Sequence, residues 1–241
     1  MPFKIAIKLP VFIYGRVDTY ILKGNVEFKN CEIKRGMVKM GMNKEYLSTV
    51  KGASLIILEL NSRLIFKGNS EFSCDFLVRT GLGAELIIGK ETFFGASVKL
   101  VSIKKILIGD YSRIGFESQV IDSNFHYTYN IEKKNLNIRD EDIIIGNYNW
   151  IGNRTTISKG TITKPFTIIA NSSITNKNYS AINEDYMILA GQPAKILAKN
   201  IRRIYDLNLE DKIYNTFLNG DLSLSIDVLN DIESSLTKLN N

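Results

Sequence analysis

The sequence contains a single histidine, His126, which lies in the polar stretch DSNFHYTYN at residues 122–130. Imidazole titrates near neutral pH, so it can take a proton from an attacking group and return it to a leaving group. His126 is therefore a candidate general base, although a loop histidine can also serve only hydrogen bonding or solubility. One histidine per chain cannot form a three-histidine zinc site unless three chains meet on a symmetry axis. We therefore expect no metal.

Three residues near His126 could support such chemistry. Asp122 and Asn124 are close enough in sequence to fix the imidazole tautomer or to contact an acceptor, and both are also common turn residues. Tyr127 could stack on a sugar ring. The sequence has no G-x-S-x-G elbow, and neither Cys31 nor Cys74 lies beside the histidine. These features favour direct attack on a bound donor without a covalent intermediate.

The stretch after this loop, residues 145–177, repeats every six residues. Side chains alternate across a strand, so an apolar residue and a small residue two positions before it share one face. A short fixed period indicates a solenoid, because stacked coils share a core that no single coil can form alone. The repeat positions are Ile145, Ile151, Ile157, Thr163, Ile169 and Thr175, and the small positions are Thr155, Thr161, Thr167 and Ser173.

The same register occurs upstream, from Ile88 to Leu100 and from Ile108 to Val120. Between these two runs the count slips by two at Lys104–Lys105, which predicts a widened corner. The register stops after Val120 and resumes near Ile143, so residues 121–142 are expected to form a loop that leaves the solenoid. Residues 41–52 do not fit the register either and are expected to form another outward loop.

The segments NWIGNRTTISKGTI, residues 149–162, and ILAGQPAKILAKN, residues 188–200, resemble the hexapeptide-repeat acyltransferases. The resemblance covers about residues 86–200 well and implies an all-β solenoid, a left-handed parallel β-helix. We predict an N-terminal cap at residues 1–23 and the β-helix at residues 24–198, with the excursion loop at 121–142. Residues 199–241 carry apolar side chains three and four positions apart, which predicts a C-terminal extension of amphipathic α-helices.

The resemblance also implies the roles of particular residues. His126 occupies the position of the family's general base, and acetyl-CoA is the implied donor. A backbone N–H near Trp150 to Gly152 could stabilise the tetrahedral oxyanion. Lysines near the donor have an electrostatic reason to be there, because coenzyme A carries phosphate charges. The residues expected to bind acetyl-CoA are Trp150, Gly152, Asn153, Asn171, Asn176, Lys177 and Lys195.

The long N-terminal coils, the NFH loop and the C-terminal helices look most like the O-acetyltransferases that modify capsular or lipopolysaccharide sugars. We therefore expect acetyl transfer to a hydroxyl of a surface-polysaccharide sugar or its precursor, with Asp122, Asn124 and Tyr127 binding the acceptor. The resemblance implies a homotrimer with its sites between subunits. The alternatives are N-acylation of a nucleotide-linked amino sugar and a non-catalytic β-helical scaffold, which would not bind coenzyme A.

Composition and charge indicate which partners and which compartment to expect. The formal net charge of +6 suits an anionic ligand, but no Lys/Arg cluster interleaves with aromatic residues, so we expect no nucleic-acid partner. No apolar run reaches membrane-spanning length, and the N-terminus lacks the features of a signal peptide. Two isolated cysteines favour a reduced compartment. We therefore expect a cytoplasmic protein without membrane insertion.

Overall fold

The computed structural model describes residues 1–43, 52–218 and 223–239. The chain divides into two compact units, Met1–Ile201 and Arg202–Asn241, which are considered separately. Most of the outward loop predicted at residues 41–52 lies outside the described residues.

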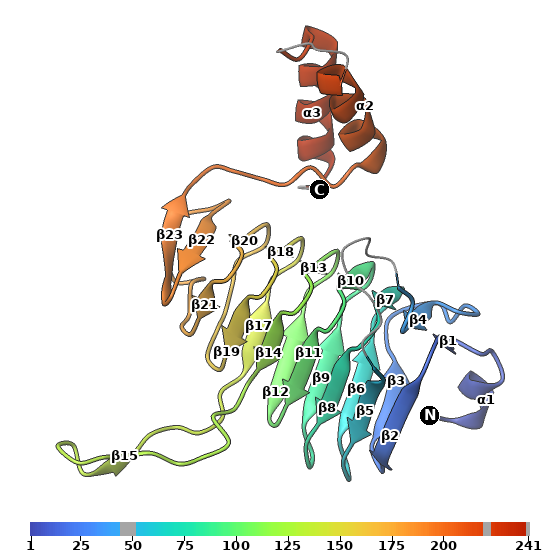
Figure 1. The fold of residues 1–241 in the computed structure, drawn as a ribbon, viewed down its shortest axis with the longest axis vertical. Coiled ribbons are helices and arrows are strands. Elements are labelled where there is room, and N and C mark those ends of the chain that lie inside the picture. Colours follow the sequence, from blue (N-terminus) through green and yellow to red (C-terminus); the bar gives the residue numbers. More distant parts are fainter. Residues whose placement is uncertain (44–51, 219–222, 240–241) are drawn as a thin grey trace. The chain divides into compact units, whose positions relative to one another are not determined.

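Within the described residues of the first unit, and apart from a two-stranded hairpin, the strands stack into three sheets, here named A, B and C (Figure 1). Neighbouring strands run parallel except in the last pair of sheet A, which is antiparallel. The chain visits the sheets in turn, so that each circuit of A, B and C makes one coil of a parallel β-helix. Sheet A contains β1 (Val11–Ile13), β4 (Val38–Met40), β7 (Ser70–Phe72), β10 (Thr92–Phe94), β13 (Arg113–Ile114), β18 (Trp150–Ile151), β20 (Ile168–Ile169), β22 (Ile188–Gly191) and β23 (Ala194–Ala198). Sheet B contains β2 (Val17–Leu22), β5 (Ser54–Leu58), β8 (Leu77–Thr80), β11 (Lys99–Ser102), β14 (Gln119–Ile121), β19 (Thr156–Ser158) and β21 (Ile174–Thr175). Sheet C contains β3 (Asn25–Phe28), β6 (Arg63–Phe66), β9 (Glu85–Ile88), β12 (Lys105–Ile108) and β17 (Ile143–Ile145).

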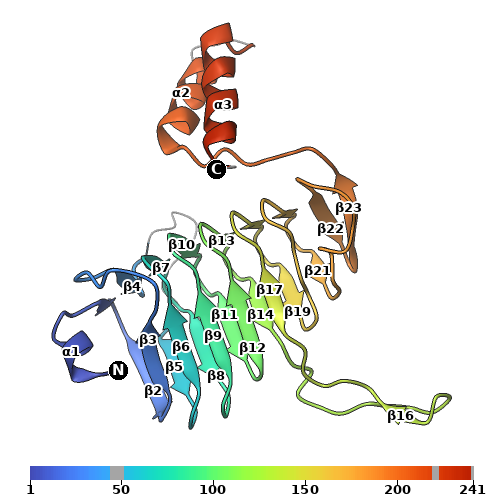
Figure 2. The same cartoon turned by 180° about the vertical axis from the view of Figure 1, so that it is seen from behind.

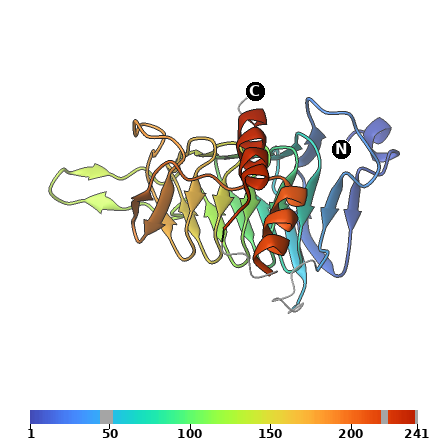
Figure 3. The same cartoon turned by 90° about the horizontal axis from the view of Figure 1, so that it is seen from above.

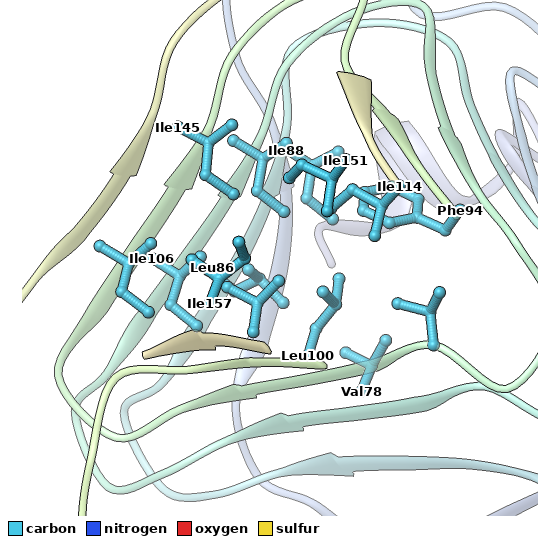
Figure 4. Close-up of a cluster of buried hydrophobic side chains, with 14 of the residues drawn as sticks. Val78, Leu86, Ile88, Phe94, Leu100, Ile106, Ile114, Ile145, Ile151 and Ile157 are labelled. Carbon is cyan, nitrogen blue, oxygen red and sulfur yellow. The ribbon is translucent and has the colours of Figure 1, made fainter. Parts of the chain in front are cut away.

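The predicted hexapeptide register is the register of the core. Ile145, Ile151 and Ile157 come from sheets C, A and B, and all three side chains are fully buried. Figure 4 shows them pointing into the centre of the coils together with their counterparts from earlier coils. The small residues at the intervening positions, such as Thr155 and Thr161, are also buried. The prediction of a parallel β-helix is confirmed.

The coils shorten along the chain. Stacked residues are 22 positions apart between Ser70 and Thr92, and 18 apart between Asn153 and Asn171. Leu100 pairs with Val120 in sheet B, whereas Ile108 pairs with Ile145 in sheet C. Leu100 and Ile108 are thus inward positions of successive sheets, and they are eight positions apart instead of the six of the regular repeat. The two additional residues lie in the corner between β11 and β12, where the sequence register slips.

The β-helix begins earlier than expected. We placed a cap at residues 1–23, but β1 pairs with β4 and β2 pairs with β5, so the first coil starts at Val11. The short helix α1 (Phe3–Ala6) precedes it. The pattern was missed because the residues of β2 are intermediate or exposed, so they do not alternate as those of a buried strand do.

One corner carries a stack of aromatic rings that the sequence register did not predict. Tyr111, Tyr148 and Phe166 occupy the same corner of successive coils between sheets C and A. Their ring centroids are 4.6 Å and 4.8 Å apart, and the rings are nearly parallel. Each has a positive φ, which is uncommon for a non-glycine residue. The stacked rings therefore form a ridge along one corner of the solenoid, outside its core.

The loop predicted at residues 121–142 leaves the solenoid after β14 and returns at β17, and it spans residues 122–142 because Ile121 still belongs to β14. It ends in a small antiparallel hairpin of β15 (Tyr129–Asn130) and β16 (Asn135–Leu136). This hairpin projects away from the coils, as the views from the front, from behind and from above all show (Figures 1, 2 and 3).

The second unit contains α2 (Leu207–Leu218) and α3 (Ile226–Lys238). The first helix begins at Leu207, later than residue 199 where the helical extension was predicted to start. The Asp206 carboxylate accepts hydrogen bonds from the N–H groups of Asn208 and Leu209 and so caps the helix there. Lys212 of α2 is paired with Asp231 of α3 at 2.6 Å. No helix in the described part of the chain is both long enough and apolar enough to cross a membrane.

Candidate active site

The loop that carries His126 starts from a buried carboxylate. The side chain of Asp122 is fully buried and accepts hydrogen bonds from Ile103 N (2.7 Å), Lys104 N (2.9 Å) and Ser102 Oγ (3.1 Å). Burial raises the pKa of this carboxyl, and the three hydrogen bonds oppose that shift. Asp122 therefore ties the widened corner between β11 and β12 to the start of the loop. We expected an acceptor contact, but no part of its side chain reaches the surface.

A second set of contacts closes the loop just beyond Asp122. Ser123 and Asp140 form an antiparallel bridge, and Ser123 Oγ donates to Asp140 Oδ1 at 2.5 Å. Asn124 N–H donates to the carbonyl of Arg139 at 3.1 Å. The outgoing and returning strands are thus joined before the chain reaches His126.

His126 lies at the outer end of this closed segment and is exposed. Phe125 before it has a φ of +59°, and His126 N–H donates to the carbonyl of Asn124 at 2.7 Å, which makes a tight turn. Among the described residues, neither Asp122 nor Asn124 is hydrogen-bonded to the imidazole. The sequence prediction that one of them fixes the tautomer therefore has no support in this geometry. The imidazole lies at the surface of the loop.

Tyr127 follows His126 and is 64% exposed. The guanidinium of Arg139 lies 5.0 Å from the ring centroid, in a cation–π arrangement. Tyr127 is thus held beside His126 with most of its ring still open to solvent. This geometry is compatible with the stacking on a sugar ring that the sequence suggested.

The residues expected to bind the donor fall on a different side of the β-helix. Trp150 is 42% exposed on the outer face of sheet A, where it pairs with Ile168. Lys195 of β23 is opposite Ala190, and opposed residues share a face of a sheet. Because Leu189 beside Ala190 is fully buried, Lys195 also faces outward. The fold therefore brings Trp150 and Lys195 onto one face.

Gly152 and the two asparagines beside it hold the corner between sheets A and B. A Cβ at Gly152 would lie 2.3 Å from Asn171 Oδ1, which itself accepts a hydrogen bond from Asn153 N at 2.9 Å. This oxygen of Asn171 is used within the fold. Asn176 and Lys177 are exposed but follow β21 of sheet B, so they do not join the face that carries Trp150.

The main-chain donors expected for an oxyanion are already engaged. Trp150 N–H donates to Thr167 O and Gly152 N–H donates to Ile169 O. The sequence suggested an oxyanion donor among the backbone N–H groups near Trp150 to Gly152, but those of Trp150 and Gly152 form the ladder between coils. The indole N–H of Trp150, which can only donate, is the side-chain donor of this stretch.

Neither Ser123 nor the Arg139–Asp140 pair was singled out from the sequence. These residues become neighbours of His126 only when the loop folds back on itself, and no repeat or motif gives the register of that pairing.

The stacked coils, the loop that extends from one corner and the returning strand β23 define a parallel β-helix built on hexapeptide repeats. Its general-base candidate leaves the corner between sheets B and C, which is opposite sheet A, where Trp150 and Lys195 lie. A single chain therefore does not place these two groups of residues side by side.

We compared the chain with protein families, characterised proteins and solved structures. No family model matches the chain. A polysialic acid O-acetyltransferase from Escherichia coli O1:K1 / APEC is 31% identical over 134 residues, which are 55% of this chain and 42% of that relative. The match thus spans less than half of the relative's length.

Two solved structures show the same fold. The polySia-specific acetyltransferase NeuO superposes with a TM-score of 0.55 at 22% identity, covering 86% of this chain and 87% of that one. The polysialic acid O-acetyltransferase OatWY superposes with a TM-score of 0.54 at 20% identity, covering 83% and 94%. The similarity to β-helical acyltransferases predicted from the sequence is confirmed.

Proposed function

We propose that this protein transfers an acetyl group from acetyl-CoA to a hydroxyl of a surface-polysaccharide sugar or its precursor. The observation that carries this proposal is the 31% identity to a polysialic acid O-acetyltransferase. Such a relative makes an acidic, sialic-acid-like polymer the first acceptor to test. Acetyl-CoA is a cytoplasmic metabolite, so the reaction belongs in the cytoplasm.

His126 is the general base of the proposed reaction. Its imidazole takes the proton of the acceptor hydroxyl while the hydroxyl oxygen attacks the thioester carbonyl. The tetrahedral intermediate then collapses, the C–S bond breaks, and the imidazolium returns the proton to the departing thiolate. The exposed imidazole supports this role, and the partly exposed ring of Tyr127 beside it offers a stacking surface for the sugar.

The donor binds along the outer face of sheet A. Lys195 supplies a cation for the phosphates of coenzyme A, and the exposed Trp150 lies on the same face. The main-chain N–H groups of Trp150 and Gly152 donate within the ladder between coils, so another group must donate to the oxyanion. Asn153 and Asn171 border this face at the corner between sheets A and B, whereas Asn176 and Lys177 lie after β21, at the corner between sheets B and C.

A complete site needs more than one chain. The loop with His126 and the face with Trp150 lie on opposite sides of one β-helix, so the base of one subunit must serve the donor site of another. The hairpin of this loop exposes large apolar side chains, including Ile131 at 83% and Leu136 at 62%. An isolated two-stranded hairpin is marginally stable in water, which favours its packing on a second subunit. A homotrimer satisfies this requirement by cyclic symmetry.

The test is acetyl transfer from acetyl-CoA, followed as thiol release, against acidic polysaccharides, neutral polysaccharides and nucleotide-linked amino sugars. We expect transfer to a hydroxylated acceptor and a loss of at least ~100-fold in His126→Ala, with coenzyme A binding retained. Transfer only to an amino sugar would replace O-acylation by N-acylation. If the wild type does not bind coenzyme A, the alternative of a non-catalytic β-helical scaffold is favoured. If His126→Ala is fully active, His126 is not the general base.

A further inference from the structure

The base of the excursion loop contains a network of polar side chains that reaches both sequence neighbours of His126. Asp140 accepts hydrogen bonds from Arg139 Nη2 at 2.7 Å and Arg139 Nε at 2.9 Å. Its other oxygen accepts from Ser123 Oγ on the outgoing strand at 2.5 Å. Both carboxylate oxygens are therefore occupied, and they link the two strands of the loop.

The network extends from Asp140 to the residues on either side of the histidine. Ser123 Oγ accepts a hydrogen bond from the N–H of Phe125 at 2.8 Å. The guanidinium of Arg139 lies over the ring of Tyr127 at 5.0 Å. His126 is thus flanked by two residues that both connect to the same ion pair. The backbone of His126 is held without any contact to its imidazole.

The arrangement depends on the shape of an arginine side chain. A planar guanidinium can bind a carboxylate through two N–H groups and at the same time cover an aromatic ring, which a lysine ammonium cannot do. The side chains of Arg139 and Asp140 are 32% and 19% exposed and lie outside the apolar core. Losing this pair should therefore loosen the loop and leave the β-helix folded.

We propose that Arg139 and Asp140 form a positioning pair that holds the backbone of His126 in place for proton transfer, acting through Ser123, Phe125 and Tyr127. This inference rests on the proposed role of His126 as the base. A small displacement of a catalytic group is sufficient to reduce a rate by about 100-fold. The donor face on sheet A lies on the other side of the coil, so coenzyme A binding should be insensitive to the pair.

The test exploits the fact that His126 is the only histidine in the chain. Labelling with ¹⁵N-histidine gives one backbone amide signal, whose heteronuclear NOE reports the rigidity of this residue without any activity measurement. The variants are Arg139→Ala, Arg139→Lys and Asp140→Asn. The matched control is Arg79→Ala, which removes a similarly exposed Arg–Glu pair at 2.7 Å on sheet B.

We expect the NOE of His126 to fall in all three variants and to remain unchanged in Arg79→Ala. kcat for acetyl transfer should fall by about 10- to 100-fold, with the KM for acetyl-CoA within about twofold of wild type. Arg139→Lys should recover only part of the loss. An unchanged NOE and kcat in Arg139→Ala would overturn the inference. A wild type that transfers no acetyl group would instead contradict the proposed function, while the NOE comparison would still decide whether the pair rigidifies the loop.

Discussion

His126 and Trp150 lie on opposite sides of the same β-helix. The first is on a loop that leaves the corner between sheets B and C, and the second is on the outer face of sheet A. If both serve one reaction, each active site combines residues of two chains.

Mixing two inactive variants tests this relationship. We expect His126→Ala and Trp150→Ala homo-oligomers each to be strongly impaired. Co-refolded one-to-one mixtures should regain about a quarter of wild-type activity, because a random interface pairs the two intact residues with that frequency in a cyclic oligomer. The measurement is thiol release after mixing and refolding. A mixture no more active than its parents would show that each site lies within one chain.

Substitution of Asp122 should destabilise the fold. Asp122→Ala leaves the N–H groups of Ile103 and Lys104 and the hydroxyl of Ser102 without their acceptor in a buried corner. We expect a loss of about 3 kcal/mol in the free energy of unfolding, measured by urea denaturation. Asp122→Asn keeps one oxygen acceptor and should lose less.

The control for this experiment is Asp110→Ala. Asp110 Oδ1 accepts a hydrogen bond from Lys90 N at 3.0 Å in a more exposed corner of the same solenoid. We expect its removal to lower the free energy of unfolding by about 1 kcal/mol or less, because water can replace the lost acceptor. Equal losses at Asp110 and Asp122 would contradict the structural importance given to the buried carboxylate.

The Asp140 carboxylate should make loop stability depend on acidity. The hydrogen bonds from Arg139, and then the one from Ser123, lower the pKa of this carboxyl, and the charge of Lys104 acts in the same direction. A carboxyl whose pKa is lower in the folded state stabilises that state above its unfolded pKa, about 3.9 for aspartate. This contribution should disappear as the pH falls through the folded-state pKa.

Limited proteolysis of the loop at pH 3 to 7 measures this effect, with an acid-active protease and with Asp140→Asn as the comparison. The wild type should be more resistant than the variant at neutral pH, and the two should converge towards the acid end. A constant difference across this range would show that the charge of Asp140 does not hold the loop.

Gly115 should tolerate no side chain. A Cβ there would lie 2.2 Å from Asn153 Oδ1 and 2.8 Å from Asn153 N in the next coil. Gly115→Ala must push two coils apart, and we expect a loss of about 3 kcal/mol in unfolding free energy. Gly52→Ala is the control, since a Cβ at that position meets nothing within 4 Å. Thermal and urea denaturation of both variants would show whether close stacking of coils is the cause.

Lys195 should contribute to donor affinity through charge. We expect Lys195→Ala to weaken coenzyme A binding by about tenfold, with the difference shrinking at high salt. Lys99→Ala removes an exposed lysine from sheet B and should leave the affinity unchanged. Isothermal titration at two ionic strengths separates these outcomes. An equal affinity for wild type and Lys195→Ala would remove Lys195 from the donor site.

The sequence by itself determined the solenoid. Its six-residue period identifies which side chains point inward, such as Ile145, Ile151 and Ile157, because those positions share one face of successive strands. It also located the widened corner and the loop that carries the only histidine, since both interrupt the period. These features are local along the chain, so short stretches of consecutive repeats are enough to reveal them.

The tertiary structure decided which residues of different coils and strands become neighbours. The folded chain buries Asp122 and makes it the hydrogen-bond acceptor of Lys104, which lies 18 positions earlier. It also engages the N–H groups of Trp150 and Gly152 in hydrogen bonds between coils. The link between Asp140 and Ser123 likewise depends on how the loop folds back. Hydrogen bonding between segments fixes the role of each polar group, and residue type and spacing along the chain do not specify that pairing.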